Sequence, residues 1–241
     1  FMTRPDFIDA AGVAHEPAHS ETRIVSLVPS ITELLFDLGL EGNLAGRTAF
    51  CVHPAERVKR IKIVGGTKTV KLDKLFAVEP THVIVNVDET PRELAEAIAA
   101  EGARVIVTHP IEAGDNLDLY RLIGGVFGRA EAAGELCAQF KAAHGRVAAA
   151  ATTLPRRRVL YLIWRDPWMT VSRDTYISRT LGLVNWRTAG HNDAERYPVV
   201  DMDEELLGAC DLVLFSSEPF VFTGEHVEEF GAAFPAHAAK A

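Results

Sequence analysis

Short apolar runs alternate with amphipathic segments over the first half of the chain. Runs of strand length occupy residues 23–28, 83–87 and 104–108, and segments of helical periodicity lie between them, including a short one at about 72–78. Strands that alternate with helices in this way are typical of βαβ units. The pattern therefore predicts a parallel sheet in a first α/β lobe.

The strand pattern disappears from Leu117 onward. Two helical stretches follow, separated at Gly128, and the second continues to about Thr152. A helix of some 23 residues is roughly 35 Å long, which is about the width of a small domain. We therefore expect one long helix between two parts of the chain.

The second half returns to the strand pattern at residues 159–164, 169–171 and 212–215. A helix is expected at about 224–232, but residues 234–241 carry no strand pattern. Because a parallel lobe would add another strand here, we expect a truncated C-terminus and an incomplete C-terminal lobe.

Three segments have the spacing of a helix N-terminal capping box, in which a Ser, Thr or Asp is followed three residues later by Glu. The predicted capping residues are Ser30, Thr90 and Asp201. The first two predict helices that begin directly after strands. Pro91 would then be the first residue of its helix.

Together these elements predict an α/β fold with two Rossmann-like lobes joined by one long backbone helix. The expected limits are 23–112 for the N-terminal lobe, 115–153 for the linking helices and 156–241 for the C-terminal lobe. In open parallel sheets, ligands bind beyond the carboxyl ends of the strands. Two lobes of this kind predict a ligand cleft between them.

Composition narrows the class of function. A formal charge of −8 without a long basic run argues against nucleic-acid binding. No apolar run reaches the roughly 20 residues that span a bilayer, so the chain is not expected to be membrane-embedded. Three cysteines in apolar surroundings imply no disulfide framework. The first 22 residues lack the apolar core of a secretory signal, which favours a cytoplasmic start at Met2.

Five segments in a fixed order resemble the substrate-binding proteins of ABC importers that have a rigid helical backbone, and their cobalamin-binding branch in particular. The resemblance covers nearly all of residues 23–235. The matching segments are 23–39, 46–54, 64–68, 161–171, and 197–198 with 216–220. It implies the class III periplasmic binding protein fold, of the helical-backbone metal receptor superfamily. It also implies a periplasmic monomer that captures cobalamin or a related corrinoid, with no intrinsic cofactor and an ABC permease as partner.

The resemblance and the turn positions together suggest a set of ligand-binding residues. A corrinoid is large and amphipathic, so its site needs apolar walls with a few polar groups at the rim. The candidates are Pro29, Ser30, Arg47, Phe50, His53 and Lys68 in the first lobe, and Trp164, Arg165, Asp166, Trp168, Ser216, Ser217, Glu218 and Phe220 in the second. Simpler roles stay open: Ser30 as a helix cap, Arg47 as a surface ion-pair partner, and both tryptophans as parts of a core.

Other functions remain as alternatives. Cys51 and His53 lie two residues apart, but two ligands are too few for a tetrahedral metal site, so no metal site is expected. An iron-siderophore or haem receptor is the nearest alternative in binding. A cytoplasmic corrinoid or metal handler and a chelatase-like enzyme are the others. No nucleotide-binding or nucleophile-elbow motif is present, so we expect no enzyme.

In this family, one carboxylate on each lobe meets arginines of the membrane permease. The matching positions here are Asp73 and Asp203, where the family usually has glutamate. Glu204 could substitute for Asp203. Charge near a helix N-terminus is the simpler explanation of both aspartates.

Overall fold

The computed structural model describes residues 7–19, 21–66, 69–192 and 194–240. It divides into two compact units: Phe1–Pro110 with Asn116–Phe140, and Ile111–Asp115 with Lys141–Ala241. The division falls inside the longest helix, α6 (Ala130–Ala151). The sequence-based limits, which assign that helix to a separate linking segment, stay a prediction.

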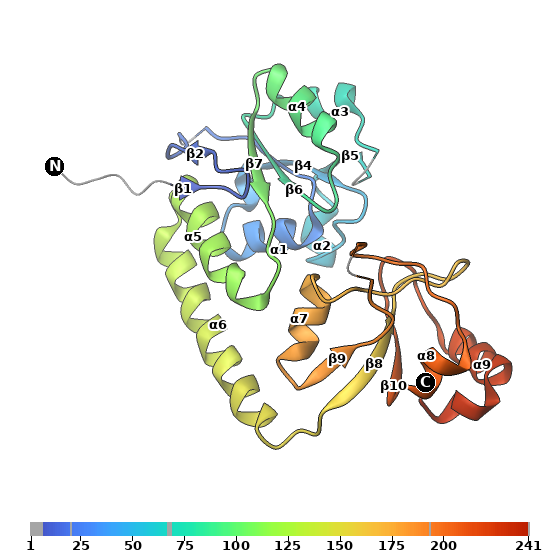
Figure 1. The fold of residues 1–241 in the computed structure, drawn as a ribbon. Helices are drawn as coiled ribbons and strands as arrows, with labels where there is room; N and C mark the ends of the chain where they lie inside the picture. The colour runs from blue at the N-terminus through green and yellow to red at the C-terminus, as the bar shows by residue number, and fades with distance from the viewer. Residues whose placement is uncertain (1–6, 20, 67–68, 193, 241) are drawn as a thin grey trace. The chain divides into compact units, whose positions relative to one another are not determined.

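The first unit is built on a five-stranded parallel sheet with the order β5-β4-β3-β6-β7 (Figure 1). The strand order reverses at the junction of β3 and β6, as in the mononucleotide-binding half of a Rossmann fold. The predicted parallel sheet is therefore confirmed, although two of its strands, β4 and β5, had not been predicted. The strands are β3 (Ile24–Ser26), β4 (Leu44–Thr48), β5 (Lys62–Gly65), β6 (His82–Asn86) and β7 (Arg104–Thr108).

Helices cover both faces of this sheet. Ile24 and Ile84 face the side packed by α1 and α5, whereas Val25 and Val83 face the side packed by α3 and α4. This is the alternation expected of a strand buried on both faces. The helical elements of the unit before α6 are α1 (Pro29–Asp37), η1 (Glu41–Asn43), α2 (Ala55–Val58), α3 (Leu72–Phe76), α4 (Arg92–Ala100) and α5 (Asn116–Val126).

A short antiparallel hairpin, β1 (Phe7–Ile8) with β2 (Ala14–His15), belongs to the first unit. Its turn is organised by the fully buried carboxylate of Asp9, which accepts hydrogen bonds from the backbone N–H of Ala11, Val13 and Val107 at 2.9, 2.9 and 3.0 Å. His15 Nε2 lies 3.0 Å from the same carboxylate. Asp9 therefore fastens the hairpin to the edge strand β7. The sequence pattern had not predicted this hairpin.

Helices α5 and α6 approach each other closely at Gly124. A Cβ atom there would overlap Ala133 Cβ and lie 2.9 Å from the carbonyl oxygen of Arg129. Gly128, between the two helices, has φ +67°, which confirms the predicted break. Although α6 has 22 residues, no described helix is both long and apolar enough to cross a bilayer.

The second unit has a three-stranded parallel sheet with the order β10-β8-β9. Its core joins Leu160 and Val213 of the sheet to Leu207 of α8 and Phe230 of α9. The expected strand at 169–171 is present only as isolated bridges of Met169. The elements are η2 (Ala113–Asp115), β8 (Arg157–Leu162), α7 (Tyr176–Gly182), β9 (Trp186–Thr188), α8 (Glu204–Gly208), β10 (Leu212–Phe215), α9 (Gly224–Ala233) and η3 (Pro235–Lys240).

Two of the predicted capping boxes are wrong because their helices begin elsewhere. Helix α1 starts at Pro29, with Val28 as its N-cap, so Ser30 lies inside the first turn. Helix α4 starts after Pro91, which is an extended N-cap with ψ 138°. Thr90 then lies one residue too early to cap the helix.

The third predicted box is wrong for a similar reason. Asp203, not Asp201, is the N-cap of α8, and its carboxylate accepts from the N–H of Leu206 at 2.8 Å. A genuine box exists where none had been predicted, at Thr223 and His226 of α9. No strand follows β10 among the described residues, and the truncated C-terminus stays a prediction.

Candidate functional site

In the first unit, four of the predicted site residues follow the carboxyl ends of β3 and β4. Pro29 and Ser30 form the start of α1, and Phe50 and His53 lie in the loop after β4. Because β3 and β4 are parallel neighbours, both segments leave the sheet at the same edge. Ser30, Phe50 and His53 are exposed, with 62% of Phe50 accessible.

Arg47 has a different environment from the exposed rim position expected of it. Its side chain is buried, and its guanidinium donates to the carbonyl oxygens of Val58, Thr48 and Cys51 at 2.9, 3.0 and 3.0 Å. These bonds hold the loop after β4 in place. Arg47 thus supports the segment that carries Phe50, and its contact with a ligand stays a prediction.

A tight turn follows β5 and lies against the same loop. Ala49 N–H donates to Gly65 O at 2.8 Å, and a Cβ at Gly66 would lie 3.4 Å from the Phe50 ring. Gly65 has φ +143°, and a Cβ there would be 2.6 Å from Thr69 O, so this turn requires glycine. Lys68, the predicted ligand contact in the turn, lies outside the described residues.

In the second unit, the turn after β8 carries two tryptophans in different environments. Trp164 is 40% exposed, and its ring packs edge-on to Phe220 with centroids 5.6 Å apart. Trp168 stacks on Phe222 at 6.1 Å and packs edge-on to Phe230, so it closes the core. Of the two roles left open for each tryptophan, a place in the core is therefore observed for Trp168, and contact of either residue with a ligand stays a prediction.

The two charged residues of the same turn also differ. Arg165 donates to Glu229 at 2.5 Å, and its guanidinium lies over the Trp168 ring at 5.8 Å. Asp166 is exposed and has φ +59°, the left-handed conformation that Asp tolerates in turns. Arg165 is therefore fixed by its neighbours, whereas the Asp166 carboxylate is largely exposed and lies 3.7 Å from Arg165 Nε.

The turn after β10 lies beside the turn after β8, because the N–H of Phe220 donates to the carbonyl oxygen of Ile163 at 3.3 Å. Ser217 and Glu218 are exposed, but Ser216 is only 6% exposed. The Ser216 hydroxyl is buried without a hydrogen-bond partner among the described residues. A buried hydroxyl in this state is destabilising unless a bound group pairs with it.

Two residues near this turn were not predicted. The pKa of Tyr161 in β8 is raised, first by burial and then by the negative charge of Glu218. His226 packs edge-on to Phe220 at 5.3 Å, and its Nδ1 accepts from the N–H of Thr223 at 2.9 Å. The Thr-x-x-His spacing could have indicated His226 as a capping partner, but no local signal places Tyr161 near Glu218.

The possible thiol and imidazole ligands lie in different environments. Cys51 is buried with its Sγ 3.2 Å from Thr48 Oγ1, whereas His53 is exposed. Among the described residues, no group of three or more His, Cys, Asp or Glu side chains is placed to hold a metal ion.

The two acidic positions expected to meet a permease both lie at helix N-termini. Asp73 is exposed in the first turn of α3, and Asp203 is the exposed N-cap of α8. Glu204 is hydrogen-bonded to His237 Nε2 at 2.9 Å, so its carboxylate is less available as a substitute.

Exposed apolar side chains recur in the loops at the carboxyl ends of the parallel strands. In the first unit they are Phe50, Val52 and Val87; in the second they are Trp164 and Val221. Soluble proteins expose apolar groups in clusters mainly where they bind something. Each unit therefore exposes large apolar side chains at this edge of its sheet.

Comparison with known proteins agrees with this arrangement. The vitamin B12-binding protein of Photorhabdus laumondii is 21% identical over 204 residues, which cover 84% of this chain and 74% of that protein. Its counterpart in Yersinia pestis is 27% identical over 94 residues, 39% of this chain and 33% of that protein.

Solved structures show the same fold. The periplasmic vitamin B12-binding protein BtuF of Vibrio cholerae has a TM-score of 0.77 at 17% identity, covering 90% of this chain and 82% of that one. A periplasmic haem-binding protein of Pseudomonas aeruginosa has a TM-score of 0.78 at 19% identity, covering 91% and 80%. These neighbours confirm the predicted two-lobed α/β fold of class III periplasmic binding proteins.

A family model described as "Periplasmic binding protein" matches residues 24–232, which span both sheets and the long helix. The chain belongs to the periplasmic binding protein family.

Proposed function

We propose that this chain is the substrate-binding protein of an ABC importer and that it captures cobalamin or a related corrinoid. The observation that carries the proposal is the pair of exposed aromatic positions, Phe50 and Trp164, each in a loop beyond the carboxyl end of a parallel strand. This role places the chain in the periplasm.

A corrinoid presents a broad macrocycle edged by amide groups, so it needs apolar contact together with hydrogen-bonding partners. The second unit offers both in one place. Trp164 and Phe220 supply ring surface. The Ser216 hydroxyl, which has no partner in the part of the chain that the structure describes, and the exposed Glu218 carboxylate follow β10. A macrocyclic amide could donate to either oxygen.

Haem or an iron siderophore is the second candidate. The exposed imidazole of His53, in the loop that carries Phe50, is a suitable axial ligand for haem iron. The fold does not choose between these ligands, because the vitamin B12 and haem proteins have nearly equal TM-scores of 0.77 and 0.78.

Titration with cyanocobalamin, haem and ferrichrome, followed by calorimetry and visible absorption, tests the proposal. We expect saturable one-to-one binding of cyanocobalamin that is tighter than binding of the other two. Binding of haem alone, with a Soret shift lost in His53→Ala, would support the second candidate. Absence of corrinoid binding would overturn the first proposal, and formation of a metallated tetrapyrrole from free metal would favour a chelatase.

Variants locate the binding surface. Phe50→Ala and Trp164→Ala should each weaken cyanocobalamin binding by about tenfold, the usual effect of removing a central aromatic contact. Ile63→Ala is the matched control, because Ile63 is 49% exposed but lies within β5 rather than in a carboxyl-end loop. An equal loss in all three variants would contradict this location.

We further propose that Asp73 and Asp203 meet arginines of the permease. The double variant Asp73→Asn/Asp203→Asn removes both charges, and Asn at 203 can still cap α8. We expect lower stimulation of transporter ATPase activity with unchanged ligand affinity. Glu101→Gln, an exposed charge change beyond the end of α4, is the control. Unchanged stimulation in the double variant would rule out these contacts.

A further inference from the structure

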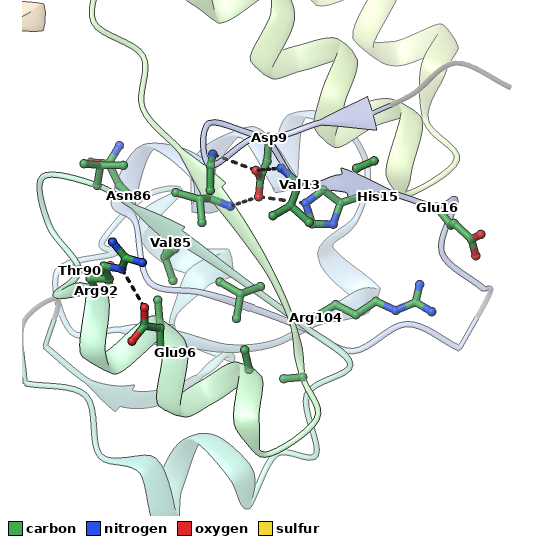
Figure 2. A pocket seen from close by; sticks show the side chains of 18 residues that line it. Asp9, Val13, His15, Glu16, Val85, Asn86, Thr90, Arg92, Glu96 and Arg104 are labelled. Atoms are coloured by element: carbon green, nitrogen blue, oxygen red, sulfur yellow. Dashed lines mark hydrogen bonds and ion pairs between the residues drawn. The ribbon is translucent and has the colours of Figure 1, made fainter. Parts of the chain in front are cut away.

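A cavity of about 870 Å³ lies in the first unit, between the N-terminal hairpin, strand β7 and helix α4 (Figure 2). It is separate from the loops proposed to bind the transported ligand. In the first unit those loops follow β3, β4 and β5, whereas the cavity lies beside β6 and β7 at the other side of the strand order. Of the exposed apolar residues at the carboxyl ends of the strands, Val87 after β6 lines the cavity, whereas Phe50 and Val52 do not. None of the predicted ligand-binding residues that the structure describes lines it.

The walls of this cavity are mostly small and apolar. Ala95 and Ala99 lie one turn apart on α4, and Val105 and Val107 lie on the same face of β7. Val13 of the hairpin turn is 51% exposed and also lines the cavity. The cavity volume is within the range of sites that enclose small organic molecules.

One polar group in the lining lacks a partner. Thr90 is only 6% exposed, lines the cavity, and its Oγ1 has no hydrogen-bond partner among the described residues. Its sequence position predicted a helix cap, but α4 begins after Pro91 and leaves the hydroxyl unused. A buried unpaired hydroxyl is unfavourable, so a ligand that pairs with it gains from the contact.

Most of the charged side chains that line the cavity have hydrogen-bond or ion-pair partners within the protein. The Asp9 carboxylate is occupied by three backbone N–H groups and His15. Arg92 pairs with Glu96 at 2.8 Å on α4. Arg104 and Glu16 carry opposite charges at the rim. Three carboxylates and two guanidinium groups line the cavity, so no positive charge is in excess to favour an anionic ligand. The additional carboxylate, that of Asp9, already has four hydrogen-bonding partners in the protein.

We propose that this cavity is a second small-molecule site, for an uncharged, mainly apolar or aromatic molecule with one hydrogen-bonding group directed at the Thr90 hydroxyl. Apolar walls select the body of the ligand, and the buried hydroxyl selects its polar group. Occupation joins the hairpin to α4 across the edge of the sheet, and so stabilises the first unit.

Two matched probes test the proposal: 2-naphthol, which has one hydroxyl, and naphthalene, which has none. Equilibrium dialysis should show saturable 2-naphthol binding, and Thr90→Val should weaken it about three- to tenfold, the range expected for one hydrogen bond. Naphthalene binding should be unchanged in Thr90→Val. Equal effects on both probes, or no binding of 2-naphthol to the wild type, would overturn the proposal.

A second pair of variants tests the location. Ala99→Phe places a ring in the cavity and should abolish binding of both probes, whereas Ala100→Phe changes an equally exposed position on α4 that does not line the cavity. Cyanocobalamin affinity should be unchanged in Ala99→Phe, which separates this proposal from the transport role. If Ala99→Phe instead dissociates a dimer seen by light scattering, the cavity is a self-association surface and the small-molecule site is wrong.

Discussion

Replacing Gly124 by alanine tests how strictly the structure requires the close approach of α5 and α6. In an unhindered helix this substitution is stabilising by about 1 kcal/mol, because glycine loses more backbone entropy on folding. At Gly124 the new Cβ would overlap Ala133 Cβ and meet the Arg129 carbonyl oxygen at 2.9 Å, against the 3.5–4.0 Å of a normal contact.

The magnitude follows from the two opposing effects. Overpacking of a buried site typically destabilises by about 1–3 kcal/mol, and here one of the opposing atoms belongs to the backbone and cannot rotate away. The close contact with a backbone oxygen favours the upper part of that range, so after subtraction of the propensity gain we expect Gly124→Ala to lower the free energy of unfolding by up to about 2 kcal/mol. Gly134→Ala in α6 is the matched control, because nothing lies within 4 Å of its Cβ position. It should raise the free energy of unfolding by about 1 kcal/mol.

Urea unfolding followed by far-ultraviolet circular dichroism measures both effects as shifts of the midpoint at constant slope. Ala133→Gly alone should be destabilising by about 1 kcal/mol. The double variant Gly124→Ala/Ala133→Gly should then lose less stability than the sum of the two single variants, since it removes one of the two clashes. A Gly124→Ala midpoint at or above that of the wild type would refute the argument from close approach.

Three further predictions concern single residues. The pKa of His82 is lowered to about 4, first by burial and then by the charges of Arg104 and His15, so the folded state resists protonation that the unfolded state accepts near pH 6.5. The free energy of unfolding should therefore fall by about 1–2 kcal/mol, after allowance for solvent screening, as the pH falls from 6.5 to 4. Unfolding curves of His82→Phe should lack this pH-dependent loss. An equal pH dependence in the variant would contradict the role of His82. Ser216→Ala should weaken binding of the transported ligand without lowering the urea midpoint, because the hydroxyl has no hydrogen-bond partner among the described residues; a clear drop in the midpoint would indicate a structural role instead. The Tyr161 phenol should ionise at higher pH than free tyrosine in an absorbance titration at 295 nm, and Glu218→Gln should move its pKa back toward the usual value; no movement would show that burial alone is responsible.

The strands that sequence patterns predicted well are the ones with uninterrupted apolar side chains. Residues 104–108 and 212–215 coincide with β7 and β10, which apart from Arg104 consist of β-branched or large apolar residues. Strand β4 was missed because Gly46 and Arg47 interrupt its pattern. A Cβ at Gly46 would lie 2.9 Å from Val64 Cγ1 and 3.1 Å from Val25 Cγ2. Close packing therefore requires glycine at this position, although glycine interrupts the apolar pattern by which the strand would be recognised.

The two loops that carry the candidate aromatic residues were proposed on different grounds. The turn after the strand predicted at 159–164 located the loop of Trp164, because ligands bind beyond the carboxyl ends of parallel strands. Phe50 was proposed from the family resemblance of residues 46–54, because strand β4 before it was missed. The role of Arg47 depends on carbonyl oxygens of Cys51 and Val58, which the chain supplies only after folding. The environment of Thr90 was also not predictable. The sequence predicts it as the N-cap of a helix, but α4 begins one residue later, and the Thr90 hydroxyl has no hydrogen-bond partner among the described residues.

The attachment of the hairpin through Asp9 has a consequence for aggregation. Strand β7 is the edge of its sheet, and an exposed edge strand offers free N–H and C=O groups on which another chain can add a strand. The N–H of Val107 is occupied by the Asp9 carboxylate, and its carbonyl oxygen accepts from the N–H of Ala10. The hairpin thus blocks strand addition at this point of the edge. If the hairpin detached from β7, the backbone N–H and C=O of Val107 would be available for hydrogen bonds with strand β7 of a second molecule.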